Sequence, residues 1–212
     1  MAATISVLIE EGRTKCFASA LDWPGWSRSG RDAPSALDAL ESYRDRYAGV
    51  LAASAIDAPT GRLGIAVTLP GDAGTDFGAP TVRCELDHRA LREPSAARLV
   101  AIMSACWRRF EHVAAAAGPL RAGPRGGGRA VAKMVTHVCD AEVAYARRLG
   151  LKVPATNGDR DAIDALRARI TRVIGGTEEP DRDAAWPPRY MARRIAWHVC
   201  DHLFEIEDRS MS

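Results

Sequence analysis

Three histidines have the residue type and spacing that most clearly indicate chemistry: His137, His198 and His202. Four residues of an α-helix turn through about 400°, so His198 and His202 leave one helix face a single turn apart and can share one divalent ion. If the segment around His137 is a helix packed beside them, three neutral imidazoles form a site for zinc or nickel with positions left open for water or substrate. The sequence therefore predicts a metal site.

The same residues also fit other interpretations. A histidine pair on a partly apolar helix can be interfacial and hydrogen-bonded to carboxylates, and a lone histidine such as His137 is usually just packed. A zinc metalloprotease is disfavoured because it requires HExxH, whereas this segment reads HVCDH. Glu205 and Asp140 each follow one of the histidines by three residues, so either is a candidate to support a ligand or to be a fourth one.

The cysteines do not predict a second metal site. They are odd in number, widely spaced and without any CxxC, which argues against a disulfide framework and a cysteine zinc cluster: Cys16, Cys84, Cys106, Cys139 and Cys200. Cys139 and Cys200 each lie two residues after a candidate ligand. Two helical residues differ by about 200° in direction, so we expect these thiols to point away from the histidines into a helix interface.

Composition excludes several classes of function. The chain of 212 residues has a net charge of +2, so no strong field favours nucleic acid or an anionic membrane. Only three of its 29 basic residues are lysines, which with the abundant alanine is typical of a GC-rich bacterial genome. No apolar run approaches the roughly 20 residues that span a bilayer, and no signal peptide precedes the first strand-like segment, so we expect a cytoplasmic protein.

The elements that must position the histidines fall into two halves. Short apolar segments predict strands over 5–9, 16–21, 27–31 and 64–69, with 27–31 at a sheet edge. The spacing of apolar residues predicts one helix that opens at 32–35 and runs through 55, between the last two strands. Trp23 and Trp26, beside a Pro-Gly turn, are expected to cover the sheet.

That order of elements resembles the HicB-like small α/β domain. The stretch ALDWPGWSRSGRDAPSALDAL is similar to the family pattern of an apolar strand, Pro-Gly, a polar strand ending in glycine, and a helix that opens with a small residue and an Ala-Leu pair. The resemblance covers about 4–70 and gives a first domain over 1–70. It implies an adaptor or antitoxin-type module without an obvious catalytic residue.

The second half has a helical period. Helices are predicted over 94–118, 129–149, 159–174 and 187–209, and the glycine-rich loop 123–128 is a connection because it lacks the Lys-Ser/Thr of a phosphate-binding loop. Segment 71–92 is predicted to be a linker, cut first by proteases near 70–80 and separating two independent halves. The expected fold class is α+β: a small α/β domain followed by an all-α four-helix bundle over 93–212.

The helical half, about 93–210, resembles the DinB-like four-helix-bundle superfamily through HVCDAEVAYARRLG and the closing HxxxH helix. The resemblance implies that His137, His198 and His202 bind a divalent metal. Family members include thiol-dependent S-transferases and isomerases that use mycothiol or bacillithiol, so a metal-dependent thiol S-transferase acting on small molecules is expected. Arg193 and Arg194 would hold acidic ligands or be solvated charges.

Two other functions remain open at this stage. The ion of the predicted site could activate water for hydrolysis instead of a thiol. The alternative outside enzymes is a partner-binding or regulatory protein, in which the metal site is structural or vestigial. In that case the HicB-like module would recognise a partner or form a homodimer.

Overall fold

The N-terminal strands form a four-stranded mixed sheet. The structure, a computed structural model, describes residues 4–52, 54–122 and 130–210. The sheet contains β1 (Thr4–Glu11), β2 (Cys16–Ala20), β3 (Ser27–Gly30) and β4 (Arg62–Pro70) in the order β3-β2-β1-β4. β1 is antiparallel to β2 and parallel to β4, and β3 lies at an edge as the sequence predicts.

The prediction of a single helix opening at 32–35 and running through 55 is wrong, because the structure has two helices there, α1 (Ala33–Ser42) and α2 (Arg44–Leu51). An uninterrupted helix would give the Leu40 carbonyl to the N–H of Arg44. In the structure the Leu40 carbonyl accepts the indole N–H of Trp26 at 2.8 Å and the N–H of Tyr43 at 3.2 Å. A tertiary contact from the Pro-Gly turn therefore ends α1.

The Pro-Gly turn brings the sheet against the last helix. Trp26 is buried and stacks on Tyr47 with ring centroids 5.6 Å apart, as expected for a residue that covers the sheet. Gly25 in this turn has φ +96°, and a Cβ there would lie 2.9 Å from Cys200 Sγ. Only glycine fits this close approach without strain.

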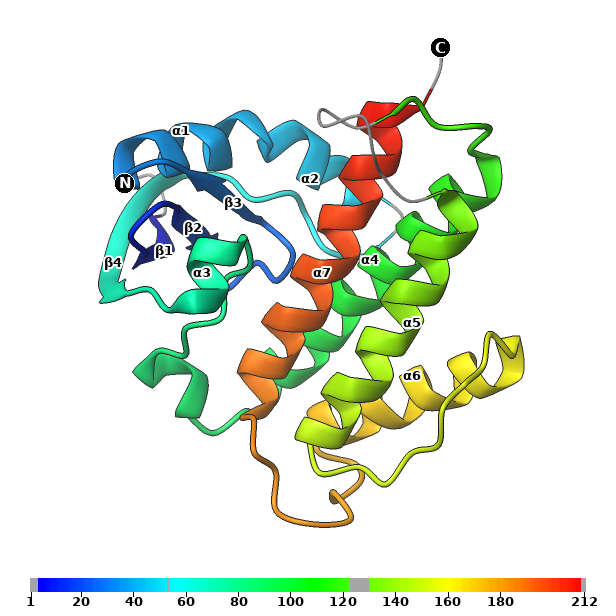
Figure 1. The fold of residues 1–212 in the computed structure, drawn as a ribbon. Coiled ribbons are helices and arrows are strands. Elements are labelled where there is room, and N and C mark those ends of the chain that lie inside the picture. The colour runs from blue at the N-terminus through cyan, green and yellow to red at the C-terminus, as the bar shows by residue number, and fades with distance from the viewer. Residues whose placement is uncertain (1–3, 53, 123–129, 211–212) are drawn as a thin grey trace.

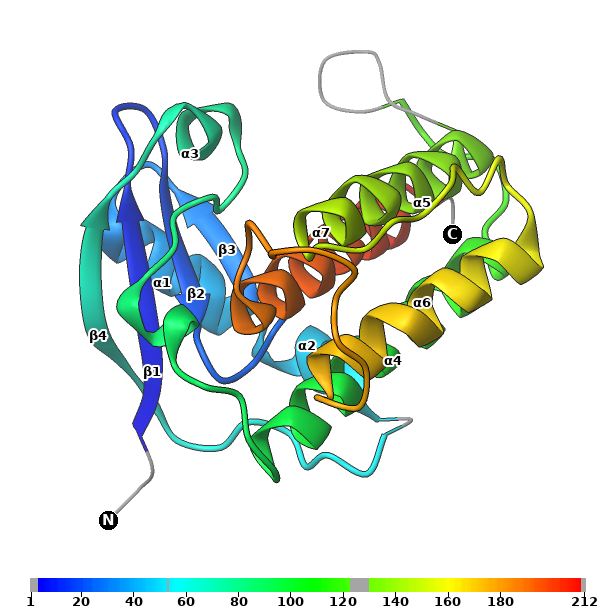
Figure 2. The same ribbon diagram turned by 90° about the horizontal axis from the view of Figure 1, so that it is seen from below.

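Four longer helices follow in the order that the periodicity predicts. They are α4 (Ser95–Ala116), α5 (Val131–Arg148), α6 (Arg160–Ile174) and α7 (Pro188–Arg209). Pro188 begins α7 and the Asp159 side chain caps α6, which explains why these two starts were predictable. Figures 1 and 2 show α7 between the sheet on one side and α4, α5 and α6 on the other.

Segment 71–92 contains a short helix, α3 (Ala73–Phe77), and a 3₁₀ turn, η1 (Glu85–His88). It is held to both halves by buried polar contacts. The Glu10 carboxylate accepts the N–H of Val82 at 3.0 Å, the Tyr190 hydroxyl donates to the Thr81 carbonyl at 2.8 Å, and further contacts come from Arg193.

One hydrophobic core extends across the sheet, α1, α2 and the bundle, from Ile5 to Ile206. The fold is α+β, with a four-stranded sheet and seven α-helices among the described residues. The domain boundaries at 70 and 93 stay a prediction. Among the helices that the structure describes, none has the length and apolarity to cross a membrane.

Candidate metal centre

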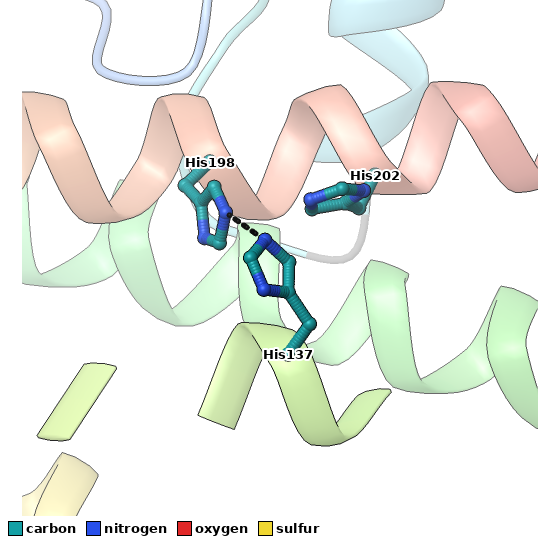
Figure 3. A group of neighbouring side chains, drawn as sticks. All are labelled: His137, His198 and His202. Carbon is teal, nitrogen blue, oxygen red and sulfur yellow. Dashed lines mark hydrogen bonds between the residues drawn. The ribbon is translucent and has the colours of Figure 1, made fainter. Parts of the chain in front are cut away.

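Two neighbouring helices bring the three predicted histidines together. His137 extends from α5, and His198 and His202 extend from adjacent turns of α7 toward it (Figure 3). Among the described residues, these three histidines form a group of His, Cys, Asp or Glu side chains close enough to share one metal ion. The other two histidines, His88 and His112, are exposed on η1 and α4.

The spacing of the imidazole nitrogens fits one ion. The Nε2 atoms of His137 and His198 are 3.1 Å apart, and the ligand atoms of all three side chains lie within 4.8 Å of one another. Two imidazoles at about 2.1 Å from a tetrahedral zinc have nitrogens about 3.4 Å apart. The separation between the His137 and His198 nitrogens is close to this value. The two ligand nitrogens that lie farthest apart must come closer before all three rings can share one ion.

Glu205 fixes the orientation of His202. Its Oε2 lies 3.0 Å from Nδ1 of His202, and its Oε1 accepts from Nη1 of Arg209 at 2.7 Å. A carboxylate at Nδ1 selects the tautomer that leaves Nε2 free of its proton and able to bind a metal. Glu205 thus contacts a candidate ligand, as the sequence spacing allowed, whereas Asp140 is exposed on α5.

The site is partly enclosed by aromatic rings. His198 and His202 are each 7% exposed, and His137 is half-buried. The rings of Tyr145 and Trp197 lie 5.9 and 6.0 Å from the His198 ring. Sequence reasoning missed Tyr145, which follows His137 by eight residues and so lies about 80° around the helix from it, a weak signal for a shared face.

The cysteines near the histidines lie in helix interfaces, as expected. Cys200 Sγ is 3.5 Å from Cys106 Sγ of α4, and both thiols are buried. The hydrogen bond with Cys106 and burial raise the pKa of Cys200, and burial raises the pKa of Cys139 to about 11. Neutral, buried thiols are poor metal ligands and poor nucleophiles.

Of the two expectations for the arginines before His198, only that of solvated charges is tested by the structure, and it is wrong. Arg193 and Arg194 are 8% and 7% exposed, so they are not solvated charges. Arg193 binds both oxygens of Asp87, with Nε–Oδ1 at 2.9 Å and Nη2–Oδ2 at 2.6 Å. Arg194 donates to the Pro80 carbonyl at 3.0 Å and to the Tyr145 hydroxyl at 3.3 Å. Helical periodicity could not show them buried, because their neighbours come from segment 71–92.

Comparisons with known proteins found no family model, no curated protein and no solved structure that matches this chain. The molecule is therefore described by its own features: an α+β fold in which two helices bring together three histidines that could hold a metal ion.

Proposed function

We propose that the protein binds one divalent ion, zinc or nickel, through His137, His198 and His202, and that it is a DinB-like thiol S-transferase acting on small molecules. The observation that supports this most is the meeting of three imidazoles from two helices at separations of 4.8 Å or less. Imidazole is a preferred ligand of both metals. Glu205 orients one of the three, which is typical of metal-binding histidines.

The number of candidate ligands favours a catalytic metal site over a structural one. Structural zinc is normally closed by four protein ligands, whereas a catalytic ion keeps a position open. Within the described part of the chain, no Cys, Asp or Glu joins the three histidines as a further candidate ligand. A bound ion of this kind lowers the pKa of a small thiol and holds it as the nucleophilic thiolate.

The protein's own residues would hold the ion, orient one of its ligands and restrict water around it. The three histidines hold the ion, and Glu205 with Arg209 keeps the His202 ring in one orientation. The rings of Tyr145 and Trp197 cover the His198 side, where they restrict water. A drier environment strengthens the electrostatic interaction between a cation and a thiolate.

Cobalt substitution tests the proposal. Cobalt-loaded protein should change its visible spectrum when a small thiol such as bacillithiol, mycothiol or cysteine is added, and it should consume an electrophile with that thiol. Cobalt-loaded His202→Ala is the control for non-specific cobalt–thiol complexes. A spectrum that stays unchanged in excess thiol, with stoichiometric cobalt in the protein, would exclude the thiol chemistry and leave a structural ion.

One observation favours partner binding as a second candidate function. β4 is an edge strand, and the Ile65 side chain on it is 53% exposed. An exposed edge with an apolar side chain is a template for pairing with another strand, including that of a second copy. Light scattering of the wild type and of Ile65→Lys tests this: a dimer that the substitution dissociates supports pairing, and a wild-type monomer excludes self-association through β4.

A further inference from the structure

A small cavity with polar groups on its walls lies between the sheet and α7. Its walls come from β2, the Pro-Gly turn, β3, segment 71–92 and α7, and they include Ser19, Ser27, Pro80, Arg193, Arg194 and Trp197. Its volume is about 10 Å³, which admits one particle of the size of water. A carboxylate or phosphate group is too large to enter without moving the walls.

Two buried N–H groups on these walls have no acceptor. Arg194 and Trp197 are each 7% exposed, and neither Arg194 Nε nor Trp197 Nε1 has a hydrogen-bond partner among the described residues. A buried donor without an acceptor costs about 1–3 kcal/mol, so such groups normally have a partner. Two of them on one cavity indicate that something accepts from both.

A third donor is present on the same walls. The hydroxyl oxygens of Ser19 and Ser27 are 2.6 Å apart and both residues are buried. One hydroxyl donates to the other in this pair, so one hydroxyl hydrogen is left for a further acceptor. The cavity therefore has donors on the side of the sheet as well as on α7.

The charge of Arg194 decides which acceptor fits best. Arg193 is neutralised by Asp87. In the described residues Arg194 donates to a carbonyl and a hydroxyl and lies over the rings of Tyr145 and Trp197, but it has no carboxylate within ion-pair distance. The interaction between the Glu10 carboxyl and Arg194 is a longer-range electrostatic one, without a hydrogen bond or ion pair. A buried cation without a counter-ion is costly, so an anion gains more here than a neutral water molecule does.

We propose that this cavity binds one monatomic anion of the chloride class, held by the N–H groups of Arg194 and Trp197 and by a hydroxyl of the Ser19–Ser27 pair. The site is separate from the metal centre and does not depend on the proposed function. Its ligand links α7, which holds two of the histidines, to β2 and β3.

Two tryptophans on the same cavity give a matched test. Trp197 has the N–H without an acceptor, whereas Trp26 also lines the cavity and donates its N–H to the Leu40 carbonyl. The melting temperature of the full-length wild type is measured in sodium chloride, bromide and gluconate at equal ionic strength. We expect chloride and bromide to raise it by at least about 2 °C over gluconate.

Trp197→Phe should lose most of this halide-dependent rise, and Trp26→Phe should keep it even if its melting temperature is lower throughout. Crystals of the wild type grown in bromide should give an anomalous peak within hydrogen-bond distance of Arg194 Nε and Trp197 Nε1. Non-anomalous density for a water molecule at that position, or an equal halide response in Trp197→Phe and wild type, would overturn the proposal.

Discussion

At the scale of single residues, Glu205 has the most specific role next to the histidines. Its contact with Nδ1 of His202 predicts that Glu205→Gln keeps the fold but weakens metal binding by about 10–100-fold, because an amide orients the imidazole less strongly and lowers its basicity. Competition with a chromophoric chelator measures the dissociation constant.

Glu207 provides the control for this substitution. It lies on the same helix and pairs with Arg46 and Arg109, away from the three histidines. Glu207→Gln should leave the metal affinity unchanged. Equal affinities for Glu205→Gln and the wild type would show that Glu205 does not support the ligand.

The raised pKa of the Glu10 carboxyl predicts how the stability of the protein depends on pH. Burial raises this pKa from 4.5 to about 7. The unfolded chain ionises near pH 4.5 while the folded protein keeps the proton until about pH 7, so this residue makes the protein less stable as pH rises between these values. Above pH 7 the loss is complete and amounts to about 3 kcal/mol.

Glu10→Gln should remove that loss, since glutamine still accepts from the Val82 N–H and never ionises. Urea unfolding at pH 5 and pH 8 should show a smaller decrease in free energy of unfolding for the variant than for wild type. Exposed Glu11→Gln, on the same strand, is the control. Parallel pH profiles for Glu10→Gln and the wild type would contradict this account of Glu10.

At the scale of elements, the buried pair of Asp87 and Arg193 connects η1 to α7. Asp87→Asn leaves the guanidinium buried without its counter-ion, and we expect it to lower the free energy of unfolding by about 3–5 kcal/mol. Urea unfolding measures this, with the exposed Asp183→Asn as a control that should change stability little. A loss below 1 kcal/mol would mean that the pair is solvated in solution.

Local signals made the long helices and the histidine site predictable. Apolar periodicity and terminal residues such as Asp159 and Pro188 set the helices, and the four-residue spacing put His198 and His202 on one face. What the sequence could not show depends on distant contacts. The break at Tyr43 needs Trp26 from the Pro-Gly turn, and the burial of Arg193 needs Asp87.

Helix α3 was missed for a different reason, since five residues are too few for a periodic pattern. Its local signal was present: the Asp72 side chain accepts from the N–H groups of Gly74 and Thr75, and the Thr75 hydroxyl accepts from the N–H of Asp72. An aspartate three residues before a threonine can be recognised as a capping box without any knowledge of the fold.

At the scale of the whole molecule, the continuous core favours cooperative unfolding. Apolar residues from both halves pack in one cluster, so we expect urea transitions followed by far-ultraviolet circular dichroism and by tryptophan fluorescence to coincide. Two separate transitions, together with a stable fragment ending near residue 70, would instead support the two domains predicted from the sequence.

The metal content of the protein tests the central claim most directly. Wild type purified without a histidine tag, loaded with zinc or nickel and dialysed, should contain about one ion per chain by elemental analysis. His137→Ala and His202→Ala should lose stoichiometric binding, and the exposed His112→Ala should keep it. A wild type that retains no ion, or a His202→Ala variant that retains one, would contradict the proposed metal site.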